Sequence, residues 1–271
     1  MKGKVRTPKA KPAPKKNSNP ATQWGILVLA GLVVISLLTF YIVKWNNTIA
    51  DSFLPNNDDF APFAVPHGYS IHGIDVSRYQ QKIQWQKVKQ TEVKGGKLEF
   101  AIIKATEGTS NTDPYFETNW QKAKQHGLIR GAYHFFVPNE PGQKQAENFL
   151  KTVTLQTGDL PAVIDAEHFY GVSLATYRKE LMACLKLIQQ KTGVVPILYS
   201  NVHFYEKYLG VAVNDYKIWL AHYQQQGAPR TRYNWHFWQH TDAGRVKGIR
   251  GPVDMNVFNG DYNEFNQLLV P

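Results

Sequence analysis

The feature that most constrains the fold is an alternation of short β-rich runs and helix-like segments that begins at residue 71. Eight runs rich in β-branched and aromatic residues predict strands. They cover residues 71–76, 100–105, 129–135, 162–165, 194–200, 218–221, 235–239 and 253–257. Helix-like segments separate most of them, such as the one that starts at Ser173 and stops at Gly193. Toward the C-terminus the helices become fewer and the strands follow one another more closely.

This alternation over residues 71–271 predicts an α/β protein, a distorted (β/α)8-type barrel with reduced helices in its last third. In such barrels the functional side chains lie at the carboxyl ends of the strands. The predicted strand ends carry polar or aromatic residues: Asp75, Glu107, Tyr133, His134, Asp165, Glu167, Tyr199, Trp219, His222, Gln239 and Asp254. We therefore expect these side chains to gather at one end of the barrel.

Three segments of distinct composition precede the barrel. Residues 1–23 are rich in Lys, Pro and Asn, which is typical of a disordered tail. Residues 25–43 form a run of 19 uncharged residues, long enough as a helix to span the hydrocarbon core of a bilayer. The predicted domains are a basic cytoplasmic tail (1–23), a single transmembrane helix (24–43), a linker containing three prolines (44–70) and the barrel domain (71–271).

The excess of basic residues belongs to the N-terminal part of the chain. The chain has 31 Lys and Arg against 21 Asp and Glu, and residues 1–44 hold eight of the basic residues and no acid. The remaining 23 basic residues almost balance the 21 acids, which argues against a nucleic-acid partner. Seven of the eight precede the apolar run, so the positive-inside rule predicts a single pass through the cytoplasmic (inner) membrane, with the barrel in the periplasm or outside the cell. A signal peptide cleaved after Ala50 is the alternative.

The run LPAVIDAEHF predicts a buried strand that ends in two carboxylates, Asp165 and Glu167. Side chains at i and i+2 of a strand lie on the same side, with Cα atoms about 6.5–7 Å apart. Two carboxylates in one cleft repel each other, so one should keep its proton to higher pH. A protonated and an ionised carboxyl group side by side are what cleavage of a glycosidic bond requires. Two further strand-end acids, Asp75 and Asp254, strengthen this hypothesis.

Aromatic side chains accompany these acids. Tyr133, Tyr199 and Trp219 lie at the predicted ends of three strands. Aromatic rings beside hydrogen-bonding groups suit sugars, whose rings have apolar faces edged by hydroxyl groups. Gln239 supplies such a group at the end of another strand. For each ring taken singly, packing in the core is the alternative interpretation.

Metal and serine chemistry find little support. The sequence has no HExxH and no GxSxG motif. His236 and His240 can share one face of a strand, but no clear third ligand accompanies them. The single cysteine, Cys184, falls on the apolar stripe of a helix-like segment, which indicates a buried structural residue. We therefore expect no metal and no other cofactor.

Eight stretches occur in the order found in one known family. They are HGIDVSRYQ (72–80), FAIIKATEG (100–108), DPYFETNWQKAKQHGLIRGAYHF (113–135), VIDAE (163–167), ILYS (197–200), IWLAHY (218–223), FWQHT (237–241) and VDMNVFNG (253–260). Together they resemble the family-25 glycoside hydrolases, the lysozymes with a DxE motif, over residues 72–266. One departure is His240, because the residue at this place is commonly aromatic in that family.

The resemblance implies a distorted barrel of eight strands with fewer than eight helices. It implies hydrolysis of the β-1,4 bond between N-acetylmuramic acid and N-acetylglucosamine in peptidoglycan. It implies that Glu167 is the general acid and base, with Asp165 beside it, and that the acidic cluster is completed by Asp75 and Asp254. The positions matching the family's sugar groove are Tyr133, Tyr199 and Trp219, to which we add Gln239 from its place at a strand end.

The spacing of the two central acids also predicts the stereochemistry. Carboxylates at i and i+2 lie too close to admit the water of an inverting enzyme, which needs about 6.5–9.5 Å between the pair. Retention is therefore expected. Both side chains point into the cleft from one strand, so the 2-acetamido oxygen of the substrate is the expected nucleophile, and the resemblance points the same way.

Two other functions fit the same features. One is a catalytically inactive glycan-binding module on the cell surface, although a pure binder gains little from crowded carboxylates. The other is a glycosidase of another amino-sugar polymer, such as chitin. Release of reducing ends from purified peptidoglycan separates the first from a lysozyme, and a parallel assay on chitin separates the second. The expected partner is the peptidoglycan strand, bound by a monomer that remodels or lyses the wall.

The charge distribution predicts the topology. A reporter enzyme that works only outside the cytoplasm should be active when fused after Asp59 and inactive when fused within residues 1–23. The reverse pattern would refute the positive-inside argument. N-terminal sequencing of the mature protein separates the two interpretations of the apolar run, because a start near Asp51 means cleavage.

Overall fold

The computed structural model describes residues 38–39, 65–93 and 96–271. The chain divides into two compact units, Met1–Leu54 and Pro55–Pro271, and nearly all described residues belong to the second. Within the described ranges no helix is both long and apolar enough to cross a membrane. The expected tail, the linker up to residue 64, and the expected transmembrane helix apart from two of its residues lie outside the described residues.

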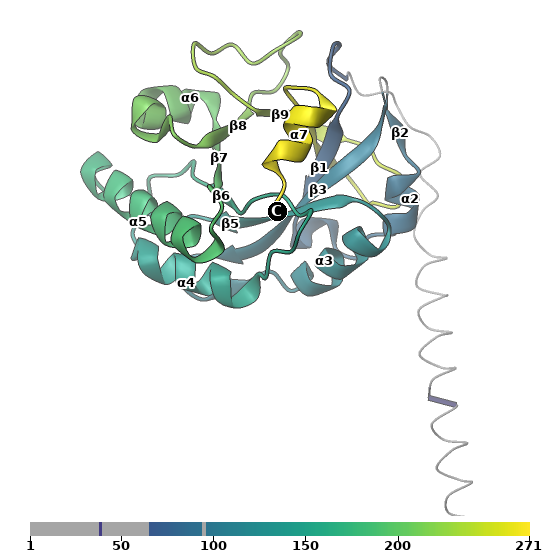
Figure 1. Cartoon of the computed structure of the whole chain (residues 1–271), viewed down its shortest axis with the longest axis horizontal. Coiled ribbons are helices and arrows are strands. Elements are labelled where there is room, and N and C mark those ends of the chain that lie inside the picture. The colour runs from purple at the N-terminus through teal and green to yellow at the C-terminus, as the bar shows by residue number, and fades with distance from the viewer. Residues whose placement is uncertain (1–37, 40–64, 94–95) are drawn as a thin grey trace, which may run out of the picture. The chain divides into compact units, whose positions relative to one another are not determined.

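Eight strands of the second unit form a closed barrel (Figure 1). They are β1 (His72–Val76), β3 (Gly96–Glu107), β5 (Ile129–Phe135), β6 (Val163–Asp165), β7 (Ile197–Asn201), β8 (Lys217–Ala221), β9 (Phe237–Gly244) and β10 (Val253–Phe258). The barrel closes because β1 pairs with β3 on one side and with β10 on the other. Short strands β2 (Glu92–Val93) and β4 (Asn111–Thr112) pair with β3. Each strand predicted from the sequence overlaps one strand of the barrel.

The strands differ in direction. Neighbouring pairs from β1 through β3 and β5 to β9 are parallel. The last strand, β10, is antiparallel to both β9 and β1. Parallel neighbours need a long crossover connection, whereas an antiparallel neighbour can follow directly. The carboxyl ends of seven strands and the amino end of β10 therefore meet at one end of the barrel.

The helices are unevenly distributed. They are α2 (Trp85–Lys89), α3 (Phe116–Gln125), α4 (Gly142–Thr152), α5 (Leu174–Thr192), α6 (Val202–Phe204) and α7 (Tyr262–Leu268), with a 3-10 turn η1 (Arg78–Gln80), a π-helical turn η2 (Tyr205–Leu209) and a 3-10 turn η3 (Gly210–Val213). The ends predicted for α5 are confirmed. The Ser173 hydroxyl accepts from the Thr176 N–H, and Gly193 ends the helix in the left-handed conformation with φ 72°.

The fold class expected from the sequence is wrong. The structure is a closed eight-stranded barrel made mostly of sheet, with few helices, rather than a helical (β/α)8 barrel. Of the described helices only α3, α4 and α5 reach ten residues. No helix lies in residues 222–236 between β8 and β9, where the chain contains Gly227 and Pro229, nor in residues 245–252 before β10. The antiparallel return of β10 makes a crossover helix unnecessary there.

Aromatic side chains fill the amino-terminal end of the barrel. Phe265 of α7 contacts the rings of Phe100, Phe237 and Phe258, with centroids 5.1–6.3 Å apart. Gly73 on β1 makes room for this cluster, since a Cβ there would lie 2.3 Å from the Phe100 ring. The helix α7 lies across this end in Figure 1. Because this end is packed, the space for a ligand is left at the other end.

Candidate active site

A cavity of about 430 Å³ opens at the end of the barrel where the parallel strands finish. All eight barrel strands contribute to its lining. The lining includes every site residue predicted from the sequence: Asp75, Tyr133, Asp165, Glu167, Tyr199, Trp219, Gln239 and Asp254. The strand-end argument therefore brought together residues that are far apart in the chain.

Two amide side chains hold Asp75. Its Oδ2 accepts hydrogen bonds of 2.8 Å from Gln239 Nε2 on β9 and of 2.8 Å from Asn256 Nδ2 on β10. Each amide uses an N–H group here, so its carbonyl oxygen is left to accept from other donors. The Asn256 Oδ1 accepts from Trp219 Nε1 at 2.9 Å. The orientation of both amides is thus fixed by their partners.

The Gln239 carbonyl extends this network to the aromatic residues. Its Oε1 accepts from the hydroxyl groups of Tyr199, at 2.9 Å, and Tyr223, at 2.7 Å. The rings of Tyr199 and Trp219 meet edge to face, with centroids 4.6 Å apart. The network links β1, β7, β8, β9 and β10 through side chains alone. The network therefore fixes the positions of Tyr199, Trp219 and Tyr223, which form the aromatic wall of the cavity.

The backbone fixes the two central acids. Asp165 is the last residue of β6, and Glu167 follows beyond the strand. Between them, the Ala166 N–H donates to the Tyr199 carbonyl at 2.9 Å. The Ala166 carbonyl accepts from the Ser200 hydroxyl at 2.8 Å. Both carboxylates therefore depend on β7, the neighbouring strand, for their position.

The environments of the two carboxylates differ. Glu167 Oε2 accepts from Asn201 Nδ2 at 3.4 Å, and Glu167 Oε1 lies 3.6 Å from His168 Nε2. The Glu167 side chain keeps 22% of its surface exposed. By contrast, Asp165 Oδ1 is shielded from solvent and has no hydrogen-bond partner. Glu167 thus contacts solvent, whereas Asp165 has a carboxylate oxygen that accepts no hydrogen bond in the free protein.

Burial disfavours the ionised form of three acids in the cavity. It raises the pKa of Asp75 to about 6, although the two amide hydrogen bonds lower it. Burial, followed by the negative charge of Glu167, raises the pKa of Asp165 well above its usual range. Burial, followed by the charge of Asp75, raises the pKa of Asp254 to about 8. Burial therefore favours the protonated form of Asp165 in the free protein.

Sequence reasoning missed several residues of this site, and three of them are Asn256, Tyr223 and Lys104. Asn256 lies two residues after Asp254 on β10, and the strand period of two could have identified it as facing the same side. Tyr223 lies beyond the end of β8, where no periodic pattern applies. Lys104 precedes the end of β3, and its Nζ lies 2.6 Å from Oε2 of Glu107.

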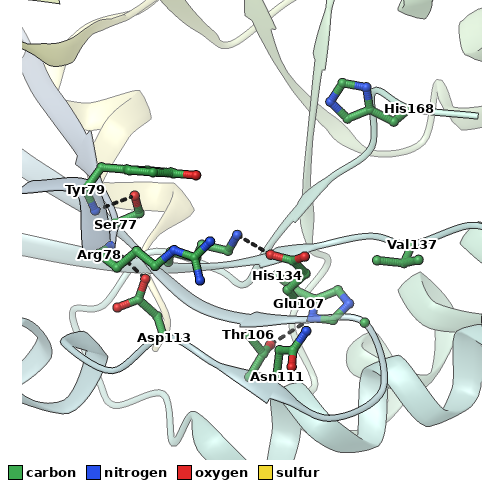
Figure 2. A network of polar contacts seen from close by, with 12 residues as sticks. Ser77, Arg78, Tyr79, Thr106, Glu107, Asn111, Asp113, His134, Val137 and His168 are labelled. Carbon is green, nitrogen blue, oxygen red and sulfur yellow. Dashed lines mark hydrogen bonds and ion pairs between the residues drawn. The ribbon is translucent and has the colours of Figure 1, made fainter. Parts of the chain in front are cut away.

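The histidines singled out from the sequence, His134, His222, His236 and His240, do not line the cavity. His134 is buried, with Nδ1 2.8 Å from Thr106 Oγ1, a contact drawn in Figure 2, and Nε2 3.1 Å from Gln145 Oε1. His222 Nδ1 accepts from the Arg230 N–H at 3.2 Å. His240, the departure from the family pattern, is buried. Among the described residues, no group of three or more His, Cys, Asp or Glu is arranged to hold a metal ion.

Carboxylates that differ in burial, gathered at the strand ends of a barrel and edged by aromatic rings, define a glycoside hydrolase site. The family model described as glycosyl hydrolases family 25 matches residues 74–249. The chain belongs to glycosyl hydrolases family 25. This confirms the family, and the enzyme class, that the sequence motifs predict.

Relatives and solved structures support the assignment to this family. The protein YegX of Escherichia coli (strain K12) is 48% identical over 205 residues, which cover 76% of this chain and 75% of the relative. Lysozyme M1 of Streptomyces globisporus is 34% identical over 206 residues, covering 70% of this chain and 68% of the relative. The structure of a family 25 glycosyl hydrolase from Bacillus anthracis matches with a TM-score of 0.69 and 32% identity, covering 75% of this chain and 95% of that one.

Because the pKa of Asp254 is raised, replacing its carboxyl group by a neutral amide should increase the free energy of unfolding at high pH. Its folded-state pKa of about 8 lies above the unfolded value of about 3.9, so the folded state keeps a proton that the unfolded state releases. Stability is therefore lost as pH rises between these values. Asp254→Asn should raise the free energy of unfolding at pH about 8 by at least about 1 kcal/mol, and change it little at pH about 3.5.

Urea denaturation at a series of pH values measures this effect. Asp215→Asn is the matched control, because Asp215 is exposed and lies outside the cavity. It should show no such dependence. A loss of stability in Asp254→Asn at pH about 8 would contradict the argument.

Proposed function

We propose that this chain is a lysozyme that hydrolyses the β-1,4 bond between N-acetylmuramic acid and N-acetylglucosamine in peptidoglycan. The observation that carries the proposal is the pair Asp165 and Glu167 at the end of β6, in a cavity also lined by Asp75 and Asp254. Membership of family 25 and the similarity to Lysozyme M1 support it. The aromatic wall fixed by Gln239 suits a sugar chain.

Glu167 suits the general acid and base. Its partly exposed side chain can reach the oxygen of the leaving sugar and, later, a water molecule from solvent. In the first step it gives its proton to the leaving oxygen, and in the second it takes a proton from the attacking water. Asn201, which donates to Glu167 Oε2, helps to orient the carboxyl group.

The nucleophile in this proposal is the 2-acetamido oxygen of the substrate. Asp165 and Glu167 approach from one strand end, so neither is well placed to attack from behind the ring. The acetamido oxygen bonds to the anomeric carbon as the glycosidic bond breaks and the leaving oxygen takes the Glu167 proton. Water then adds to the same carbon, gives a proton to Glu167 and releases the acetamido group. Two displacements at one carbon retain its configuration.

Asp165 suits the residue that orients the acetamido group. Its Oδ1 has no partner in the free protein and can accept the acetamido N–H. Burial and the charge of Glu167 raise its pKa, so a positive charge nearby is needed to favour its ionised form. The charge that develops on the acetamido group supplies this. Asp75, whose pKa is about 6, adds negative charge to the cavity at neutral pH.

We also propose that the barrel acts outside the cytoplasm, on the wall near the membrane, in remodelling or lysis. The basic residues that precede the 25–43 run support this location. Cell fractionation tests the role, since activity found mostly in the culture medium would contradict action on the nearby wall.

Loss of the Glu167 proton should abolish turnover without loss of the fold. Glu167→Gln should lower kcat on purified peptidoglycan by at least about a hundredfold, a typical general-acid contribution. Mass analysis of the released muropeptides measures it. The control is Glu117→Gln on the exposed face of α3, which should be fully active. A folded Glu167→Gln variant with near-normal turnover rules out the assignment.

Retention predicts the anomer of the first product. Proton NMR during the earliest turnovers should show the β anomer of N-acetylmuramic acid before mutarotation. An initial α anomer would mean inversion and refute the mechanism. A covalent sugar trapped on Asp165 would preserve retention but remove the role of the acetamido group.

A further inference from the structure

A turn at the mouth of the cavity presents one arginine. Ser77 begins the turn η1, and its N–H donates to Gln80 Oε1 at 2.9 Å while its hydroxyl accepts from the Tyr79 N–H at 3.3 Å. The Arg78 N–H donates to Asp113 Oδ2 at 2.7 Å, and Figure 2 shows Asp113 beneath the turn. Gln80 Nε2 donates to the Pro252 carbonyl at 3.1 Å. The backbone that carries Arg78 is thus held from several sides.

The Arg78 side chain is exposed, and the nearby charges of Glu107 and Asp113 act on its guanidinium without forming an ion pair with it. It lines the cavity, and its guanidinium forms none of the ion pairs found among the described residues. Its direct contacts are with Tyr79, whose ring centroid lies 5.5 Å from the guanidinium carbon and whose side chain is also a hydrogen-bond partner. The other cation of the described lining, Lys104, is paired with Glu107 at 2.6 Å. Arg78 is therefore the lining cation left available to a ligand.

The charge of the cavity makes such a cation useful. Its lining carries five acids, Asp75, Glu107, Asp165, Glu167 and Asp254, against the two cations. Each N-acetylmuramic acid carries an anionic group, which is either the free carboxylate of its lactyl ether or the carboxylates of a peptide stem attached there. A ligand of this kind is repelled by those acids that are ionised, which at neutral pH do not include most of Asp254, since its pKa is about 8. An unpaired guanidinium at the mouth offsets this repulsion and matches a carboxylate with its forked donors.

We propose that Arg78 is a specificity-determining residue that binds a carboxylate carried by the lactyl side of N-acetylmuramic acid. This inference rests on the proposed function. The held turn keeps the arginine Cα in place, so little backbone order is lost on binding. Tyr79, a residue of which 76% is exposed, gives the guanidinium a flat ring as its neighbour at the mouth of the cavity. Arg78 thus favours acidic wall strands over neutral amino-sugar polymers.

Three forms of the glycan strand test this with the full chain. The first keeps its peptide stems, the second has lost them to an amidase and exposes lactyl carboxylates, and the third has its carboxylates neutralised by coupling to ethanolamine. For Arg78→Gln, KM on stem-bearing strands should rise about three- to tenfold, with kcat within about twofold. On neutralised strands the variant should match the wild type. A KM effect that persists without stems assigns the lactyl carboxylate, and one that disappears assigns the stem.

Two further variants separate charge from structure. Arg78→Lys keeps the charge and should recover part of the KM effect, less than a full return because the fork is lost. Lys186→Gln removes one positive charge from the exposed face of α5, outside the cavity, and should leave KM unchanged. The difference between wild type and Arg78→Gln should shrink as salt is raised from about 0.05 to 0.5 M.

An equal KM for Arg78→Gln and wild type on both acidic strands overturns the inference, and so does an equal rise on neutralised strands. Failure of the wild type to release reducing ends from any of the strands refutes the proposed function instead. Equilibrium dialysis of the same three strands against wild type and Arg78→Gln measures the contribution of Arg78 to binding affinity, independently of turnover. There, equal affinity for acidic strands overturns the inference.

Discussion

A buried carboxylate shared by two amide side chains joins the barrel to its site. Asp75 on β1 accepts from Gln239 on β9 and Asn256 on β10. Because β1 also closes the barrel between β3 and β10, these hydrogen bonds act where the sheet meets itself. The amide oxygens then fix the positions of Tyr199 and Trp219. Loss of one amide would leave the buried Asp75 carboxylate with one side-chain hydrogen bond in place of two. It would also remove the acceptor that positions Tyr199 or Trp219.

The two ends of the barrel serve opposite purposes. At the amino-terminal end, α7 places Phe265 against an aromatic cluster and excludes solvent. At the other end, buried Asp75 and half-buried Asp165 and Asp254 line one cavity even though burial raises the pKa of each. Burying such groups costs folding free energy, and packing elsewhere offsets that cost. The same crowding gives the site carboxyl groups of differing proton affinity.

Much of the site could be predicted because its residues obey local rules. The strand period and the preference of barrels for function at strand ends sufficed for the acids Asp75, Asp165 and Asp254. The same rules were too permissive for His134 and His222, since a strand end says little about which way a side chain turns. These rules did not identify Tyr223, because it lies in an irregular segment and its side chain is positioned by a hydrogen bond to Gln239.

The sequence by itself determined the eight strands, the ends of α5, the family and the eight predicted site residues that line the cavity, because these depend on side-chain periodicity and short motifs. Only the tertiary structure decided that β10 runs antiparallel, that few helices cover the barrel, and that Asn256 supports Asp75. It also decided that Asp165, rather than its neighbour, has its acceptor shielded. Strand direction, burial and hydrogen-bond partners depend on segments distant in the chain, and no local pattern contains them.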